Sequence, residues 1–164
     1  MIRRFIRPLA ALAALAVVPL GTTLAVDGPG TASIGPIVIE RGWAREAPPG
    51  ARASGGYATI RNTGDAADRL VAASAAFAER VELHEMSVVD GTMRMREVED
   101  GLAVEPGASV TLEPGGLHLM FLDIADPPAA GDTVSVTLRF ERAGEATLEL
   151  PVAPIGAASF EAAR

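Results

Sequence analysis

The chain has 164 residues, enough for one domain with its own hydrophobic core. Acidic residues outnumber basic ones and give a formal net charge of -7, so we expect no nucleic-acid partner, because the phosphate backbone would repel the chain. Cysteine is absent. The chain therefore has no disulfide, no cysteine for a lipoprotein anchor and no thiolate metal ligand.

The first 25 residues are typical of a secretory signal peptide. Three arginines precede an apolar run from Leu9 to Val18, and Ala25 is a small residue suited to the cleavage position. The apolar run is short for a membrane span. We expect export, cleavage near Ala25 and no stable membrane insertion afterwards, with an uncleaved membrane anchor as the alternative.

The rest of the chain has the pattern of a β-domain. Residues 26–36 are rich in glycine, proline and small side chains, which favours a flexible leader. Short apolar segments then recur about every ten residues with turn residues between them, which predicts an all-β sandwich over residues 37–155. The alanine-rich stretch Ala72–Ala78 is compatible with a helical turn, and residues 156–164 are expected to form a disordered tail.

Histidine and methionine are concentrated in one region of the chain. The two histidines and the four methionines beyond the initiator are His84, Met86, Met93, Met95, His118 and Met120. Each histidine lies two residues before a methionine, so on a strand each pair projects from one face. A random distribution of methionines would rarely be this narrow.

A predicted hairpin brings the first histidine and three methionines to one face. Asp90-Gly91 is a strong indication of a two-residue hairpin turn. A hairpin with this turn pairs Met86 with Met95 and places Met93 and His84 on the same face. The opposite face is charged and polar, so the histidine–methionine face should point inward or into a site.

The second segment presents its own histidine and methionine. His118 and Met120 share one face of the expected strand, whereas Leu117, Leu119 and Phe121 share the other, which is the natural core face. His118 and Met120 therefore face either a second apolar surface or a ligand.

Thioether sulfur is a soft, neutral donor and imidazole a borderline one, a combination that suits Cu(I). Zinc and calcium normally take thiolates, more imidazoles or carboxylates. A blue-copper site needs a cysteine, and an oxidase would need more than two imidazoles, so we expect a binding protein and not an enzyme. The alternative is a structural secreted sandwich whose methionines fill the core.

The segment from Val81 to Asp123 resembles the periplasmic copper chaperones called PCuAC. Their signature is a histidine, a methionine eleven residues later and a downstream His-x-Met, which His84, Met95 and His118-Leu119-Met120 match. The separation from Met95 to His118 is one residue longer than in the family pattern. Met86 and Met93 therefore stay open as alternative or additional ligands.

The resemblance implies a cupredoxin-like Greek-key β-sandwich with an exposed Cu(I) site in the periplasm, formed by His84, Met95, His118 and Met120. It also implies copper delivery for assembly of a respiratory oxidase copper centre, with cytochrome c oxidase subunit II and Sco-type copper proteins as partners. Copper buffering for homeostasis is the alternative role. The tail from Ala153 to Arg164 has no histidine or methionine, so we expect a single site.

Overall fold

The computed structural model describes residues 28–163, which contain eleven β-strands, one short 3-10 helix and no α-helix. The elements are β1 (Ala32–Ile34), β2 (Ile37–Arg45), β3 (Ala53–Asn62), β4 (Asp68–Ala75), β5 (Ala78–Val89), β6 (Thr92–Glu97), β7 (Leu102–Val104), β8 (Ser109–Leu112), β9 (Leu117–Ile124), β10 (Thr133–Phe140), β11 (Gly144–Ala153) and η1 (Phe160–Ala163). The expected signal peptide lies outside the described residues.

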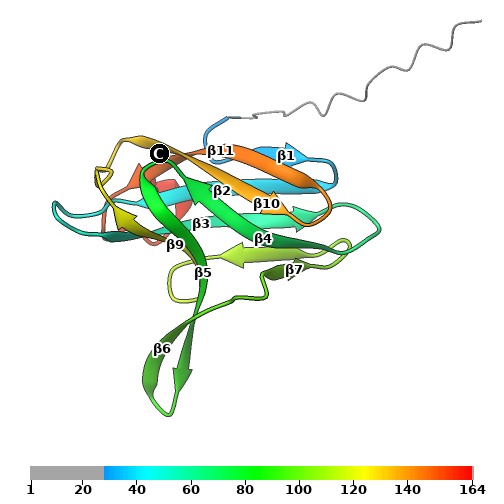
Figure 1. The fold of residues 1–164 in the computed structure, drawn as a ribbon, viewed down its shortest axis with the longest axis horizontal. Coiled ribbons are helices and arrows are strands. Elements are labelled where there is room, and N and C mark those ends of the chain that lie inside the picture. The colour runs from blue at the N-terminus through cyan, green and yellow to red at the C-terminus, as the bar shows by residue number, and fades with distance from the viewer. Residues whose placement is uncertain (1–27, 164) are drawn as a thin grey trace, which may run out of the picture.

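Seven strands close into a ring in the order β2–β11–β10–β4–β5–β9–β3, because β3 also pairs with β2. The pairings around the ring are antiparallel except for a short parallel contact between β11 and β2. The remaining strands flank it: β1 pairs with β2, β7 with β4, β8 with β3 and β6 with β5. The ring is flattened into two packed layers (Figure 1), which confirms the predicted all-β sandwich.

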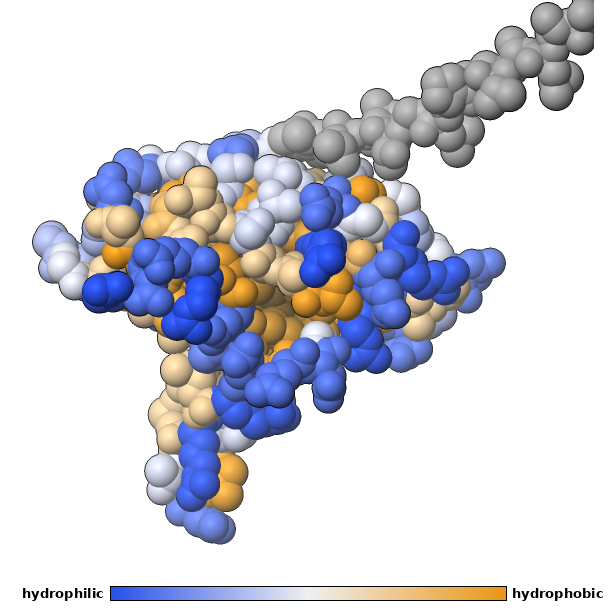
Figure 2. All heavy atoms as spheres, in the orientation of Figure 1, coloured by the Kyte–Doolittle hydropathy of each residue, from blue (hydrophilic) through white to orange (hydrophobic). Residues whose placement is uncertain are grey.

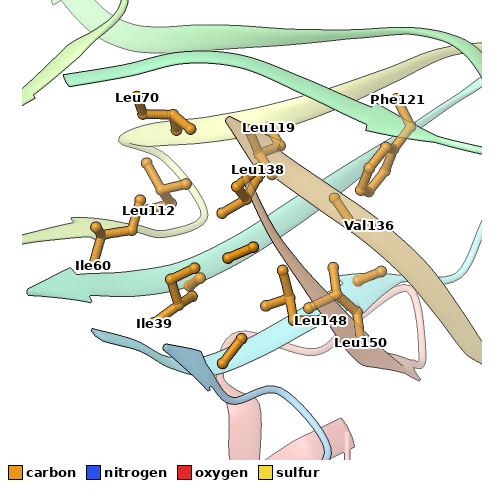
Figure 3. Close-up of a cluster of buried hydrophobic side chains, with 14 of the residues drawn as sticks. Ile39, Ile60, Leu70, Leu112, Leu119, Phe121, Val136, Leu138, Leu148 and Leu150 are labelled. Carbon is orange, nitrogen blue, oxygen red and sulfur yellow. The ribbon is translucent and has the colours of Figure 1, made fainter. Parts of the chain in front are cut away.

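The main core fills the space between the layers. Alternate residues of β10, namely Val136, Leu138 and Phe140, are almost fully buried, and they meet Leu148 and Leu150 of β11. Figure 3 shows four of these side chains, Val136, Leu138, Leu148 and Leu150, converging with others from β2, β3 and β9. Burial of each such side chain contributes about 1.5–3 kcal/mol, so a chain without disulfides can hold this fold by packing alone.

A second, smaller apolar cluster lies outside the main core. Trp43 of β2 and Tyr57 of β3 form a cross-strand pair whose ring centroids are 4.3 Å apart. Ala153 and Ala157 complete the cluster, and Phe160 of η1 packs against it. Both large aromatic rings are buried.

Two expectations about irregular segments are wrong. The expected leader contains β1, whose residues Ala32 and Ile34 are buried because they pair with β2 and contribute to the core. The expected disordered tail contains η1, which is held by the contact of Phe160 with the second cluster. Small, polar composition suggested flexibility at both places, but packing against the body orders them.

The alanine-rich stretch is also not helical. Residues up to Ala75 belong to β4, and a two-residue turn follows before β5 begins at Ala78. Pairing of β4 with β10 and β5 supplies hydrogen bonds that outweigh the local helix preference of alanine. Residues 28–163 include no helix with the length and apolar character required to cross a membrane.

The end of β5 and most of β6 form a hairpin that projects from the body, here called the arm (residues 86–95; Figure 1). Its turn residues Asp90 and Gly91 have positive φ angles of 52° and 76°, as a primed hairpin turn requires. Met86 pairs with Met95, which confirms the predicted register.

Candidate metal centre

β5 connects the ring to the arm and carries the first histidine at the junction. His84 is paired on one side with Glu97 of β6 and on the other with His118 of β9. The two imidazole rings consequently lie edge to face, with centroids 5.9 Å apart. Strand pairing therefore joins two histidines that are 34 positions apart in the sequence.

β9 separates core side chains from site side chains by simple alternation. Leu119 and Phe121 are buried in the main core, so His118 and Met120 project from the other side of the strand. Met120 lies between Glu82 of β5 and Gly55 of β3 in the pairing register. The predicted division of faces on this strand is confirmed.

A cavity of about 440 Å³ opens beside this face of β9. Among the sequence-predicted site residues, Met86, Met95, His118 and Met120 line it. Figure 2 shows that apolar surface is exposed both on the body and along the arm. The fold therefore brings thioethers from the arm and an imidazole and a thioether from β9 to one cavity.

His84 presents an imidazole nitrogen without a partner. Its Nε2 lies 2.9 Å from Oε2 of Glu82, and an ionised carboxylate only accepts, so Nε2 carries the proton. The other nitrogen, Nδ1, is then a lone-pair donor, and it is buried without any hydrogen-bond partner. A buried acceptor left unpaired costs roughly 1–3 kcal/mol, which a ligand at this position would recover.

His118 has the complementary tautomer. Its Nδ1 lies 3.0 Å from the carbonyl oxygen of Gly116, which can only accept, so Nδ1 donates and Nε2 keeps its lone pair. The same carbonyl accepts a hydrogen bond from the backbone N–H of Met86 at 3.1 Å. Gly116 therefore fixes the ring of His118 and the base of the arm together.

A chain of charges holds Glu82 in place. Arg80 bonds both Glu82 and Asp123, and Arg52 bonds Asp123 at 2.9 Å. The hydrogen bond from Arg80, helped by Arg52, keeps the pKa of Asp123 below its ordinary value. The carboxylate that orients His84 is thus itself oriented, as in other sites where outer partners fix a metal-binding histidine.

The lining residues that sequence reasoning did not assign to the cavity include an aromatic and a basic one. Tyr57 and Arg45 both line it, and the guanidinium of Arg45 stacks over the rings of Tyr57 and Trp43. The Tyr57 ring centroid lies 6.5 Å from that of His118, and burial raises the pKa of Tyr57 despite the nearby Arg45. Nothing local in the sequence distinguishes these two residues from ordinary core and surface positions.

Met93 is not gathered into the cavity. It shares the face of Met86 and Met95 as predicted, but it lies farther along the arm and is 62% exposed. His84 does not line the cavity either, although its ring contacts the ring of His118. Of the six sequence-predicted residues, four thus line the cavity, His84 lies beside it against the ring of His118, and Met93 lies farther along the arm.

The histidines and methionines of the site offer soft and borderline donors only. Three thioethers and two imidazole lone pairs are available, all neutral. Within residues 28–163 no group of three or more histidine, cysteine or carboxylate side chains is placed to hold a metal ion. This chemistry fits a soft, low-charge metal ion and not a hard divalent one.

Fold and site together define a β-sandwich domain with an open imidazole–thioether site. Several solved structures are similar to this chain. The copper-bound PCuAC domain from PmoF2 is 30% identical, with a TM-score of 0.64, and the match covers 74% of this chain and 96% of that domain. The apo PmoF2 PCuAC domain is 29% identical with a TM-score of 0.66, covering 79% and 98%. The CuI-DR1885 solution structure from Deinococcus radiodurans is 24% identical with a TM-score of 0.50, covering 68% and 74%, and supports the fold alone.

Sequence comparison then gives the family. The family model "Putative lipoprotein LpqE-like" matches residues 37–152. "Putative lipoprotein Lxx21020" from Leifsonia xyli subsp. xyli (strain CTCB07) is 30% identical over 116 residues, which are 71% of this chain and 69% of that protein. The chain belongs to the LpqE-like family.

Proposed function

We propose that this protein is an exported, non-enzymatic carrier that binds one Cu(I) ion through His84, Met95, His118 and Met120. The observation that carries the proposal is the pair of opposed imidazoles, each with one nitrogen fixed by a hydrogen bond and the other available as a lone-pair donor, next to a cavity that three thioethers line. Similarity to a copper-bound PCuAC domain supports copper as the ion.

Both Met86 and Met95 line the cavity, so one of them supplies the second thioether. We assign Met95, because its side chain is 49% exposed and can stay bound while a partner approaches from solvent. Met86 faces it directly across the hairpin and is the alternative ligand. Met93 lies too far along the arm to complete this set.

The donor set explains how the protein could hold and release the ion. Neutral thioethers bind without losing a proton, and a neutral imidazole whose one N–H is used in a hydrogen bond binds through its other nitrogen. Glu82 beside His84 and Glu97 opposite it offset the charge of the bound ion. Release requires only that an incoming soft donor replace these ligands one at a time, which an open cavity permits.

We propose delivery to a respiratory oxidase copper centre in the periplasm, with cytochrome c oxidase subunit II and Sco-type proteins as partners. The likeness to PCuAC domains and the expected signal peptide support this destination. Copper buffering for homeostasis is the second candidate role, because a solvent-accessible site serves storage equally well. Incubation of the Cu(I)-loaded chain with the apo soluble domain of subunit II separates the two roles. A carrier transfers copper by direct contact, so transfer is faster than when copper must first dissociate and pass through a chelator in solution.

Competition with a Cu(I) chelator tests the binding site. The unaltered chain should bind one Cu(I), and His118→Ala or Met120→Leu should weaken binding by about tenfold or more, as loss of a ligand requires. Val89→Ala, on the opposite face of the arm, is the matched control and should bind like the parent. Circular dichroism checks that each variant keeps its β-structure.

Parental affinity in both ligand variants would overturn the proposal. It would favour a structural sandwich in which methionines serve only as apolar packing. A titration with Cu(II) and Zn(II) adds a second check, because the proposed site should prefer Cu(I) over both.

A further inference from the structure

The arm exposes an apolar face where a solvated hairpin would normally carry polar side chains. Val88, Met93 and Met95 are 69%, 62% and 49% exposed, and they lie on one face. The other face carries the ion pair between Glu85 and Arg96, at 2.5 Å. The exposed methionines forgo about 1.5–3 kcal/mol each that burial would contribute, so packing does not explain their position.

The three thioethers on the arm are close enough to bind one ion together. Met86 and Met95 are directly opposed, and such pairs have Cβ atoms about 4.5–5.5 Å apart. Met93 faces Val88, so it is the diagonal neighbour of Met86, at about 7–8 Å and within reach of long side chains. Methionine has three rotatable bonds beyond its Cα, so the three sulfur atoms can converge above the hairpin.

We propose that the arm holds an outer Cu(I) position formed by Met86, Met93 and Met95, through which the ion enters and leaves the inner site. This inference rests on the proposed copper-binding function. Three neutral thioethers without an imidazole suit Cu(I), and no redox change or proton transfer accompanies binding there.

The two positions are continuous because they share donors. Met86 and Met95 belong to the arm and also line the cavity that contains His118 and Met120. An ion on the arm reaches the inner site when His118 and Met120 replace Met93, with a shared thioether still bound. Only one ion is held at a time, in agreement with a single inner site.

The experiment removes both imidazoles and asks which thioether holds the remaining ion. In the His84→Gln/His118→Gln chain, residual Cu(I) binding should persist with sulfur-only ligation by X-ray absorption. In that chain Met93→Leu should lower the residual affinity by about tenfold or more, and Met120→Leu by less. Leucine keeps the volume and apolar character of methionine, so the comparison isolates the sulfur.

A gain-of-binding pair gives a matched control. Val88→Met in the imidazole-free chain adds a fourth thioether opposite Met93 and should raise the residual affinity. Val89→Met adds the same group on the opposite face, where it meets Thr92, and should leave the affinity unchanged. Both positions are exposed, so neither change disturbs the core.

Should the imidazole-free chain fail to fold, kinetics in the otherwise unaltered protein give the answer. Met93→Leu should slow Cu(I) exchange with a chelator by at least about threefold, and Val89→Met should not. Unchanged exchange in Met93→Leu, or a larger effect of Met120→Leu than of Met93→Leu on residual binding, overturns the outer position. Absence of any Cu(I) binding by the unaltered chain would instead overturn the proposed function.

Discussion

Glu82 does not face the cavity as a ligand, yet it determines what His84 can do. By accepting a hydrogen bond from Nε2–H at 2.9 Å it leaves the lone pair on Nδ1, and Arg80 holds the carboxylate in position. Without Glu82 the ring could rotate or change tautomer, and the donor would point elsewhere. In the proposed site the carboxylate therefore acts on the ion through the imidazole.

Glu82→Ala should lower Cu(I) affinity by about 10- to 100-fold, the usual cost of losing the outer partner of a metal-binding histidine. Chelator competition measures the effect. Glu79→Ala removes an exposed carboxylate from the opposite face of the same strand and should change the affinity little. Equal affinities in the two variants would show that the bond to His84 has no role in binding.

At the scale of single residues, the sequence predicts the donors better than their surroundings. The narrow range of the histidines and methionines marks them as a set, and alternation places His118 and Met120 away from the core. The contributions of Tyr57 and Arg45 come from β3 and β2, whose nearness to β9 depends on the closed ring. Local patterns carry no information about such long-range pairing.

The arm is the element that the sequence determines most fully. Its turn, register and faces all follow from Asp90-Gly91 and strand alternation, because a two-residue loop leaves one way to pair the flanking strands. The same reasoning could not predict the pairing of β5 with β9. It joins distant segments, and no turn fixes His84 opposite His118.

Gly91→Ala should loosen the arm without unfolding the body. Gly91 has a φ of 76°, and a side chain there costs roughly 1–2 kcal/mol even though the space around it is open. Amide hydrogen exchange in residues 86–95 should therefore accelerate by about 5- to 30-fold. Amides of β10 should exchange at the parental rate, and faster exchange there as well would mean that arm and ring unfold together.

The whole molecule is a ring with its main core on the inside and the aromatic cluster of Trp43 and Tyr57 on the outside, next to the site. The sequence predicts the sandwich class from recurrent short strands. It misses β1 and η1, because their composition resembles that of flexible segments and their order comes from contacts with the body.

Burial of Tyr57 links overall stability to alkaline pH. Its pKa in the folded state is raised above the ordinary value of 10.0 mainly by desolvation. As the pH rises through 10 the unfolded chain loses this proton first, so the free energy of unfolding falls until the folded-state pKa is passed. Below pH 10 this stabilisation is fully present.

Denaturant titrations between pH 8 and 11, followed by the fluorescence of Trp43, should show this decline in the parent and less of it in Tyr57→Phe. Trp43 is the single tryptophan of the chain and stacks on Tyr57, so its emission reports local and global unfolding. Parallel declines in the two proteins would assign the alkaline effect to other groups.

The proposed donors are divided between two mechanically distinct parts of the protein. His84, His118 and Met120 belong to ring strands, whereas Met86 and Met95 belong to the projecting arm (Figure 1). Any binding partner that bends the arm consequently widens or narrows the gap between sulfur and nitrogen. Movement of the hairpin can thus change the affinity for a bound ion, while the hydrophobic core stays undisturbed.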